Sequence, residues 1–194
     1  MLHYFIIYKP FQVLSQFSAS AGKLTLKDSF TVPSDVYPVG RLDYDSEGLL
    51  ILTNDATLNH RLLNPQFRHE REYRVQVDGP IDNKAIDQLK AGVTITIDGK
   101  PFHTAPCNAG IFKEEPKLPP RNPPIRFRKN IPAPWIWLTL TEGKNRQVRK
   151  MTASVGFPTL RLVRYRIGRI TLDTMQPGEQ REMEQAAIYK LLFE

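Results

Sequence analysis

The segment that decides our interpretation of the fold is Tyr37-Pro-Val-Gly-Arg-Leu-Asp-Tyr-Asp-Ser-Glu-Gly-Leu-Leu-Ile-Leu-Thr-Asn-Asp55. Residues 49–52 form an apolar run of strand length, and Gly48 directly before this run favours a bend into the strand. The polar loop before the strand contains one arginine and three carboxylates, Arg41, Asp43, Asp45 and Glu47. Functional side chains often lie on loops that rigid elements hold in place, so this loop is the first candidate for a site.

Aspartate and serine are also common in turns, because their side chains satisfy nearby backbone groups. From residue types alone, a purely structural turn is therefore the simpler interpretation. The ordered pattern over residues 40–50, Gly-Arg-Leu-Asp followed by Ser-Glu-Gly-Leu-Leu, resembles the second motif of the pseudouridine synthases, in their RsuA-like branch that modifies ribosomal RNA. In that family the aspartate of this motif is the catalytic residue, and the resemblance assigns this role to Asp43.

Composition places the chain among globular proteins. Its 194 residues, 41% hydrophobic and 24% charged, suffice for one ordinary domain or two small lobes. No apolar run approaches the length of a membrane span, and Lys9-Pro10 interrupts the apolar start of the chain, which does not resemble a secretory signal. The single Cys107 excludes an internal disulfide and a zinc site made of cysteines, so we expect a cytoplasmic protein.

The net charge of +7 and the pI of about 9.6 favour a polyanionic partner. Basic residues concentrate in residues 121–129, 144–150 and 161–169. Aromatic residues lie among or beside these clusters, as in proteins that bind single-stranded RNA: Phe127, Trp135, Trp137 and Tyr165. A solvated basic surface without a partner is the alternative that charge alone leaves open.

Hydrophobic periodicity predicts a mixture of strands and helices. We expect strands at residues 4–9, 49–52, 72–78, 93–97, 135–141 and 160–167, with residues 102–112 pairing back after a turn at Asp98-Gly99. We expect helices at residues 55–63, 81–91, 146–155 and 183–192, the first capped by Asn54 and the third by Asn145. Residues 15–30 are weakly patterned and are expected to form a loop.

Residues 113–134 are rich in proline and basic side chains and cannot form regular elements. A loop longer than about 15 residues in a compact domain is usually functional or disordered. We interpret this segment as RNA-binding through Arg126, Arg128 and Lys129, and a flexible linker is the alternative.

Further motifs follow the order of the same family. Lys9-Pro10 resembles the first motif, a packing element beneath the catalytic loop. Glu72-Tyr-Arg-Val resembles the motif whose tyrosine, here Tyr73, stacks on the target uracil; without the resemblance, a buried core tyrosine is an equal interpretation. Residues 142–149 resemble the third motif, whose final arginine, here Arg149, pairs with the catalytic aspartate; by position alone, a surface arginine on an amphipathic helix would be favoured. Residues 162–168 continue the family's C-terminal pattern.

The resemblance implies an α+β pseudouridine-synthase fold, with a long mixed, mainly antiparallel sheet, flanking helices and a central cleft. It is closest to members that act on large-subunit ribosomal RNA. Only eight residues precede Lys9-Pro10, so we expect residues 1–194 to be one catalytic domain without the S4-type RNA-binding domain of many relatives. We expect a monomer that binds ribosomal RNA and no membrane.

The implied reaction breaks the bond from ribose C1′ to uracil N1, turns the base and rejoins it through C5. It requires no ATP, metal or organic cofactor. Asp43 must be ionised, and Arg149 is the candidate for its counter-charge; attack at C6, attack at C1′ and a glycal route all remain open. The basic residues assigned to RNA are Arg41, Arg126, Arg128, Lys129, Lys144, Arg146 and Arg164.

Two other classes of function fit part of the sequence. A non-catalytic RNA-binding protein of ribosome assembly explains the basic surface but gives no reason for the aspartate motif. A metal-dependent nuclease would use Asp43, Asp45 and Glu47, which alternate like residues on one face of a strand. Sugar hydrolysis by a carboxylate pair is less favoured because of the positive charge. Activity on uridine-containing RNA in EDTA distinguishes these classes.

Overall fold

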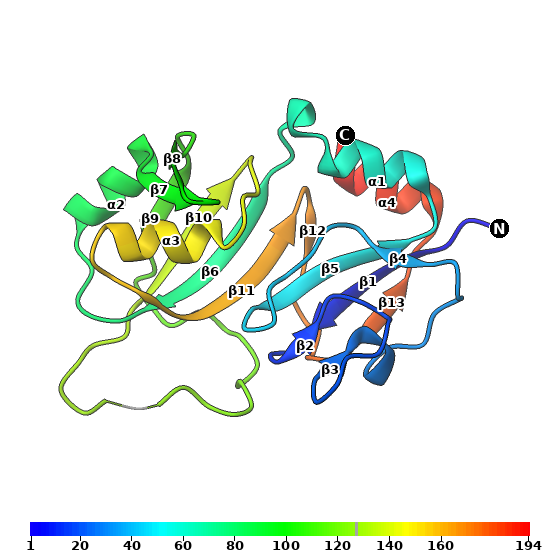
Figure 1. Cartoon of the computed structure of the whole chain (residues 1–194), viewed down its shortest axis with the longest axis horizontal. Coiled ribbons are helices and arrows are strands. Elements are labelled where there is room, and N and C mark those ends of the chain that lie inside the picture. The colour runs from blue at the N-terminus through cyan, green and yellow to red at the C-terminus, as the bar shows by residue number, and fades with distance from the viewer. Residues whose placement is uncertain (127) are drawn as a thin grey trace. The chain divides into compact units, whose positions relative to one another are not determined.

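A computed structural model describes residues 1–126 and 128–194, so Phe127, one of the aromatic residues noted beside the basic clusters, lies outside the described residues. The chain divides into two compact units, which we describe separately (Figure 1). Unit 1 comprises Met1–His69 and Val163–Glu194, and unit 2 comprises Glu70–Leu162. Strands with mainly antiparallel pairing dominate both units, and helices accompany them, which confirms the predicted mixed fold class.

In unit 1, the strands follow the order β13 (Gln180–Glu182), β1 (Tyr4–Lys9), β5 (Glu47–Thr53) and β11 (Thr159–Ile167), whose last part belongs to this unit. The short strands β4 (Tyr37–Pro38) and β12 (Ile170–Thr171) pair with β5 and β11. The β5–β11 pair is parallel, whereas β1 is antiparallel to both of its neighbours. Both β1 and β5 are buried along their whole length, as their apolar sequences predict.

Gly48 does not form the predicted bend before the strand, because β5 begins at Glu47 and includes Gly48. Gly48 pairs with Lys9 on one side and with Arg164 on the other, and its φ is +119°. A Cβ atom at this position would lie 2.3 Å from the carbonyl oxygen of Arg164. A glycine is therefore required here by the close approach of the backbones.

Residues 15–30, which we expected to be a loop, contain the short strand β3 (Leu24–Thr25) and the 3-10 turn η1 (Leu26–Asp28). β3 pairs in parallel with β2 (Val13–Leu14). Leu26 and Phe30 are buried in one hydrophobic cluster with apolar side chains of β1 and β5. The segment is thus anchored by two apolar side chains that its weak local pattern did not reveal.

The helices of unit 1 are α1 (Ala56–Leu63), the 3-10 turn η2 (Pro65–Phe67) and α4 (Gln185–Phe193). Asp55, not the predicted Asn54, caps α1, because its carboxylate accepts two backbone N–H groups of the first turn. The hydroxyls of Tyr4 and Tyr189 donate to the same carboxylate at 2.8 and 2.7 Å, which ties β1, α1 and α4 together. Burial and this hydrogen bond raise the pKa of Tyr189 to about 12.

In unit 2, the antiparallel strands follow the order β6 (Arg71–Val77), β10 (Trp135–Leu140) and β9 (Asn108–Ile111). β7 (Thr94–Ile97) and β8 (Lys100–His103) form the predicted hairpin around Asp98-Gly99. Residues 102–112 only partly pair back as expected, because β8 ends at His103 and β9 pairs with β10 instead. Pro106 lies between β8 and β9 and lacks the N–H that a continuous strand would need.

The helices of unit 2 are α2 (Asn83–Ala91) and α3 (Gln147–Ser154) (Figure 1). Asn145 does not cap α3: the residue before the helix is Arg146, whose φ is +52° and whose side chain makes no capping bond. Gln147, buried inside the first turn, instead binds the segment that precedes the helix. Its amide oxygen accepts from the N–H of Lys144 at 2.9 Å, and its amide nitrogen donates to Glu142 at 2.6 Å.

The other predicted helices and long strands are confirmed, with ends that differ by at most two residues. Residues 113–134 contain no helix or strand among the described positions, as predicted. In the described part of the chain, no helix has the length and apolar character needed to cross a membrane.

Candidate active site

Asp43 lies in unit 1, in the partly buried loop between β4 and β5. The side chain of Ser15 holds the preceding residue, Leu42, at two points. Its hydroxyl oxygen accepts from the N–H of Leu42 at 3.0 Å and donates to the carbonyl oxygen of Leu42 at 2.8 Å. The carbonyl of Tyr44 accepts from the backbone N–H of Gln12 at 2.8 Å. The backbone on both sides of Asp43 is therefore fixed by the segment that follows β1.

Lys9 lies beneath this loop, at the end of β1, with no exposed surface. Its ammonium group donates to the carbonyl oxygens of Pro10 at 2.8 Å and Val13 at 2.7 Å. Burial lowers the pKa of Lys9 to about 7, although the carboxylates of Glu47, Asp43 and Asp45 act in the opposite direction. Lys9 is buried, as the packing role expected for Lys9-Pro10 requires. It also places a titratable group within electrostatic range of Asp43.

Glu47 and Arg164 complete this buried group of charges, with 2% and 5% of their surface exposed. They lie on neighbouring strands: Val163 pairs with Glu47, and Arg164 pairs with Gly48. Nε of Arg164 donates to the carbonyl oxygen of Leu49 at 2.7 Å. This burial supports a structural role under the loop, and the position of Arg164 gives no support to the phosphate contact that we expected. Arg41, in contrast, is exposed, as a phosphate contact requires.

Tyr73 and Arg149 lie in unit 2. Tyr73 is partly buried on β6, opposite Leu138 of β10, and packs against the hydrophobic core of the unit. Arg149 is half-buried on α3, and its Nη1 lies 3.5 Å from the carbonyl oxygen of Thr159 at the start of β11. Both positions are compatible with the predicted roles and with purely structural ones.

Lys144 and Arg146 are exposed on the turn before α3. This turn has a defined conformation because Gln147 binds both ends of it, and Glu142 in turn accepts from the N–H of Ala105 at 2.9 Å. The ammonium of Lys144 lies 5.0 Å from the centre of the Phe102 ring. The two cations are therefore presented to solvent from a fixed backbone.

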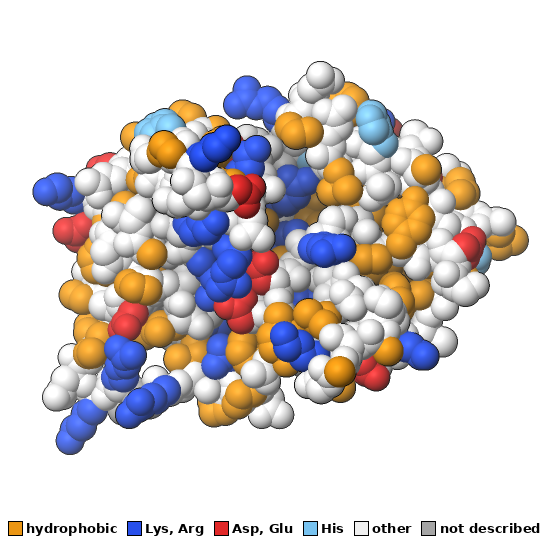
Figure 2. All heavy atoms as spheres, in the orientation of Figure 1, with side chains coloured by type: hydrophobic (Ala, Val, Ile, Leu, Met, Phe, Trp, Pro, Cys, Tyr) orange, Lys and Arg blue, Asp and Glu red, His pale blue; other side chains and the backbone are white. Residues whose placement is uncertain are grey.

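The proline-rich loop, residues 113–134, carries the other predicted RNA contacts. Figure 2 shows Lys and Arg side chains exposed over this loop, at the lower left of the view. Arg126, Arg128 and Lys129 are all exposed. Arg128 also forms an ion pair within unit 2, since its Nη1 lies 2.8 Å from Oδ2 of Asp78.

The structure thus groups the predicted residues by unit. Unit 1 holds Asp43, Arg41 and Arg164, together with Lys9, which was expected beneath the loop, and Ser15, whose part in the site the sequence pattern did not indicate. Unit 2 holds the remaining candidates, Tyr73, Arg126, Arg128, Lys129, Lys144, Arg146 and Arg149. The pairing of Asp43 with Arg149 involves residues of different units and stays a prediction.

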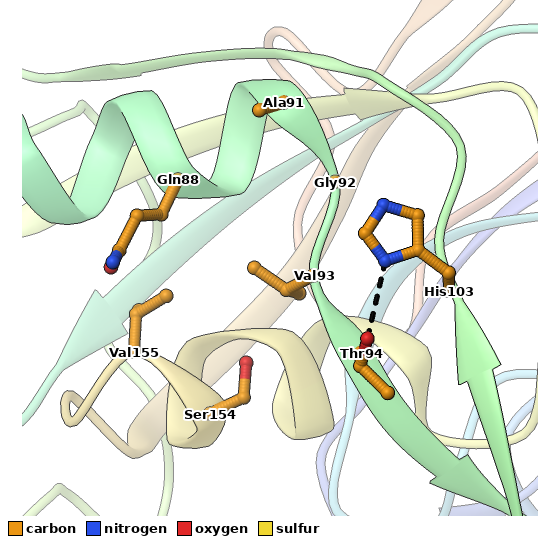
Figure 3. A pocket seen from close by; sticks show the side chains of 8 residues that line it. All are labelled: Gln88, Ala91, Gly92, Val93, Thr94, His103, Ser154 and Val155. Atoms are coloured by element: carbon orange, nitrogen blue, oxygen red, sulfur yellow. Dashed lines mark hydrogen bonds between the residues drawn. The ribbon is translucent and has the colours of Figure 1, made fainter.

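Unit 2 contains a cavity of about 340 Å³ between α2, β7 and α3 (Figure 3). His103 and Thr94 face one another across its edge, with Nδ1 3.2 Å from Oγ1, and Gln88 and Ser154 complete its polar lining. The described lining residues include no carboxylate, so this cavity lacks the aspartate that the predicted reaction requires. Within residues 1–126 and 128–194, no group of three or more His, Cys, Asp or Glu side chains could hold a metal ion.

Comparison with known proteins gives concordant matches. Residues 3–154 match a family model described as RNA pseudouridylate synthase. A Vibrio parahaemolyticus protein named "Ribosomal large subunit pseudouridine synthase E" is 48% identical over 179 residues, which is 92% of this chain and 73% of that protein. A Xanthomonas campestris protein of the same name is 47% identical over 185 residues, which is 94% of this chain and 96% of that protein.

A solved structure entitled "Crystal structure of pseudouridylate synthase" is similar over 99% of this chain and 74% of its own, with a TM-score of 0.78 and 26% identity. The span matched by the family model includes Lys9, Asp43, Tyr73 and Arg149. The similarity therefore covers the candidate residues of both units.

Proposed function

The chain belongs to the RNA pseudouridylate synthase family, and we propose that it isomerises a specific uridine of large-subunit ribosomal RNA to pseudouridine. The observation that carries this proposal is the position of Asp43. Its carboxylate is partly buried on a loop that Ser15 fixes, and the buried Lys9 lies beneath this loop. Two relatives that share nearly half of their aligned residues with this chain bear the name of a large-subunit enzyme. The net charge of +7 suits an RNA substrate.

In this proposal Asp43 acts as an ionised carboxylate on the reacting nucleotide. The glycosidic bond between C1′ and N1 breaks, and a bond between C1′ and C5 forms. The proton on C5 is lost and N1 gains one, so atoms and electrons balance without an oxidant or reductant. A positively charged Lys9 favours the ionised form of nearby carboxylates, and Arg149 supplies a further counter-charge by analogy with the third motif of the family.

The remaining candidates bind and position the RNA. A uridine inside a helix cannot reach a side chain, so it must be extruded, at a cost of a few kcal/mol that is smaller for a base in an RNA loop. Stacking of the uracil on Tyr73 offsets part of this cost. The exposed cations that hold phosphates in this proposal are Arg41, Arg126, Lys129, Lys144 and Arg146. We infer that the enzyme acts as a monomer in the cytoplasm.

The test uses large-subunit rRNA transcripts that carry tritium at C5 of uridine, incubated with the purified protein in EDTA. Isomerisation releases tritium to water because the C5 proton is lost, and the RNA remains intact on a denaturing gel. Mapping of pseudouridine in the product identifies the modified position, and the Asp43→Asn protein is the control.

Each rival class predicts a different result in this experiment. A metal-dependent nuclease would be inactive in EDTA and would cleave the RNA when magnesium is restored. A non-catalytic assembly protein would bind the transcript and release no tritium from free RNA or from pre-ribosomal particles. Either result would overturn the proposed function.

A further inference from the structure

The proline-rich loop is attached to unit 2 at several points, which argues against a free linker. Its hydrogen bonds to residues outside the loop come from side chains and backbone alike. They include Arg128 to Asp78 at 2.8 Å, Gln76 to the carbonyl of Ala133 at 3.0 Å, and Arg161 to the carbonyl of Pro119 at 2.8 Å. The N–H groups of Val77 and Gly79 also donate to the carbonyls of Pro134 and Pro132, at 3.1 and 2.9 Å. Arg161 is itself buried and lies above the Trp135 ring. The loop therefore lies against the ends of β6 and β10 and the start of β11.

This arrangement encloses a cavity of about 540 Å³ between the loop and these strands. Its size lies within the range of roughly 300–1,000 Å³ that is usual for sites that bind small molecules or parts of larger ligands. Among the described residues, the apolar part of the lining consists of Ile125, Ile131, Pro132, Ala133 and Leu160. Ile131 is 43% exposed, so an apolar surface is accessible at the opening.

The polar part of the lining combines cations with amides. Three cations face one carboxylate, and the carboxylate, Asp78, is already paired with Arg128. Arg126 and Lys129 are exposed at the rim. The amide side chains of Gln76 and Asn130 also line the cavity and provide groups of the kind that bind base edges. An apolar surface with amides beside it and cations at its opening matches the three parts of a nucleotide, namely base face, base edge and phosphate.

We infer that this cavity is a second RNA site, built from unit 2 alone, which binds one unstacked nucleotide of the substrate other than the uridine that is isomerised. The inference rests on the proposed function, which supplies the RNA. The base lies on the apolar lining beside Ile131, and its phosphate lies between Arg126 and Lys129. Arg128 also lines the cavity, and its exposed ion pair with Asp78 is one of several contacts of the loop that forms the cavity.

The first test separates the base from the phosphate. Ile131→Ala removes apolar surface without a change of charge, so it should raise KM about three- to tenfold and leave kcat and the salt dependence of RNA binding unchanged. Arg126→Ala with Lys129→Ala should raise KM further and flatten the plot of log K against log salt by about 0.7 for each phosphate that is no longer neutralised. The matched control is Lys113→Ala with Lys117→Ala, two cations of the same loop that do not line the cavity.

The control pair changes the net charge by the same amount, so it measures the non-specific part of the effect. It should alter KM less than about twofold. Equal effects of the two double variants, or an unchanged KM in Ile131→Ala, would overturn the inference. If pseudouridine forms while every cavity variant keeps the wild-type KM, the second site is wrong and the proposed function stands.

The second test does not depend on turnover. RNA that contains 4-thiouridine is photo-crosslinked to the intact Asp43→Asn protein, and the modified peptides are identified by mass spectrometry. Crosslinks to residues 125–126 or 128–132 support the site, and crosslinks confined to other segments contradict it. A polyglutamate peptide with an attached photoreactive group that crosslinks there, while RNA does not, would assign the cavity to an acidic protein and would also overturn the inference.

Discussion

The loop that carries Asp43 and the proline-rich loop are both irregular segments with charged side chains, but the protein holds them by different means. The first is fixed by buried groups: Ser15 binds the backbone of Leu42, and Lys9 has no exposed surface. The second is held partly by Gln76 and Arg161 and partly by an exposed ion pair, in which the side chains of Arg128 and Asp78 are 50% and 22% exposed. Buried polar contacts are expensive to lose, whereas exposed ion pairs contribute about 0–1 kcal/mol.

This difference suits the different roles that we propose for the two loops, catalysis and RNA binding. A catalytic carboxylate must be held near its productive geometry, and small displacements reduce the rate strongly. A loop that binds RNA phosphates tolerates small movements, because distributed cations retain most of their attraction when one of them shifts. We therefore expect changes near Asp43 to alter kcat or stability, and changes in the proline-rich loop to alter KM and its salt dependence.

The largest effect is expected for Asp43→Asn, which keeps the shape of the side chain and removes the carboxylate. Turnover in the tritium-release assay should fall by about 10³-fold or more, because removal of a group that acts on the reacting atoms costs factors of this size. RNA affinity should stay within about threefold of the wild type, since the phosphate contacts lie elsewhere. Residual turnover within about tenfold of the wild type would remove Asp43 from the catalytic role.

Arg149→Ala tests whether a residue of unit 2 acts on the chemistry of the Asp43 loop. If Arg149 supplies a counter-charge, its loss makes the ionised carboxylate less favourable, so the acidic limb of the pH–rate profile should move to higher pH. Turnover at neutral pH should fall by about 10²-fold. Arg149→Lys should recover only part of the activity, because a lysine offers a point charge without the planar fork. An acidic limb that does not move in Arg149→Ala would contradict the pairing.

Lys9 should link the stability of unit 1 to pH. Its pKa is lowered from 10.5 to about 7 by burial, so between these values the unfolded chain binds more protons than the folded one. The free energy of unfolding should therefore rise with pH between about 7 and 10, by at most about 1.4 kcal/mol per pH unit from this group. Below about pH 7 the lysine is protonated in both states, and the dependence disappears.

The measurement is urea unfolding at about pH 7, 8 and 9 for the wild type and for Lys9→Met. The variant should show a flatter dependence on pH, because the titrating group is gone. Lys27→Met, an exposed lysine of η1, is the control and should keep the wild-type slope. Equal slopes in all three proteins would mean that Lys9 keeps its charge over this range.

The fold could be predicted from the sequence largely because its strands carry strong local signals. β1 and β5 are apolar runs, and β6 alternates, with Val75 and Val77 buried. Local sequence signals did not identify the correct residue at the helix N-termini, where neighbouring side chains could each form the cap. Asn54 and Asp55 are both good caps, and Asn54 instead binds Asp35 and the carbonyl of Met1. Before α3, no side chain makes the capping bond that the sequence indicated for Asn145, and Arg146 with a positive φ precedes the helix.

The supports of the candidate site could not be predicted, because they are tertiary contacts. Ser15 and Leu42 are 27 residues apart, and Arg164 and Leu49 are 115 residues apart. A basic side chain in a basic chain is expected on the surface, yet Arg164 and Lys9 are buried. The motifs identified Asp43 and placed Lys9-Pro10 beneath its loop, whereas the hydrogen bonds of Ser15 and the burial of Arg164 are visible only in the folded chain.

Ser15→Ala removes the side chain that most directly fixes the Asp43 loop. It leaves a buried N–H and a buried carbonyl of Leu42 without their partner, so it should destabilise the protein by about 1–3 kcal/mol in urea unfolding. It should also lower kcat by about tenfold with little change in KM, because the carboxylate is less well positioned. The matched control is Ser18→Ala, a serine three residues further along the same segment, for which both quantities should stay unchanged. A Ser15→Ala protein with full kcat would show that the loop needs no such support.

The smallest effects on stability and RNA binding are expected for changes to the pair of Asp78 and Arg128. The direction of the effect on RNA binding shows whether charge or position matters more. Other hydrogen bonds also hold the proline-rich loop, so loss of this exposed pair should change the free energy of unfolding by less than about 1 kcal/mol. Charge should then dominate RNA binding. Asp78→Asn removes a repulsive carboxylate from the cavity and should tighten RNA binding about twofold, whereas Arg128→Ala removes a cation and should weaken it about twofold. Fluorescence anisotropy with a labelled RNA at low salt measures the affinity of both variants.

If instead both variants weaken RNA binding equally, and the double variant weakens it no further, the pair acts by holding the loop in position. The proline-rich loop would then be held as strictly as the loop of Asp43.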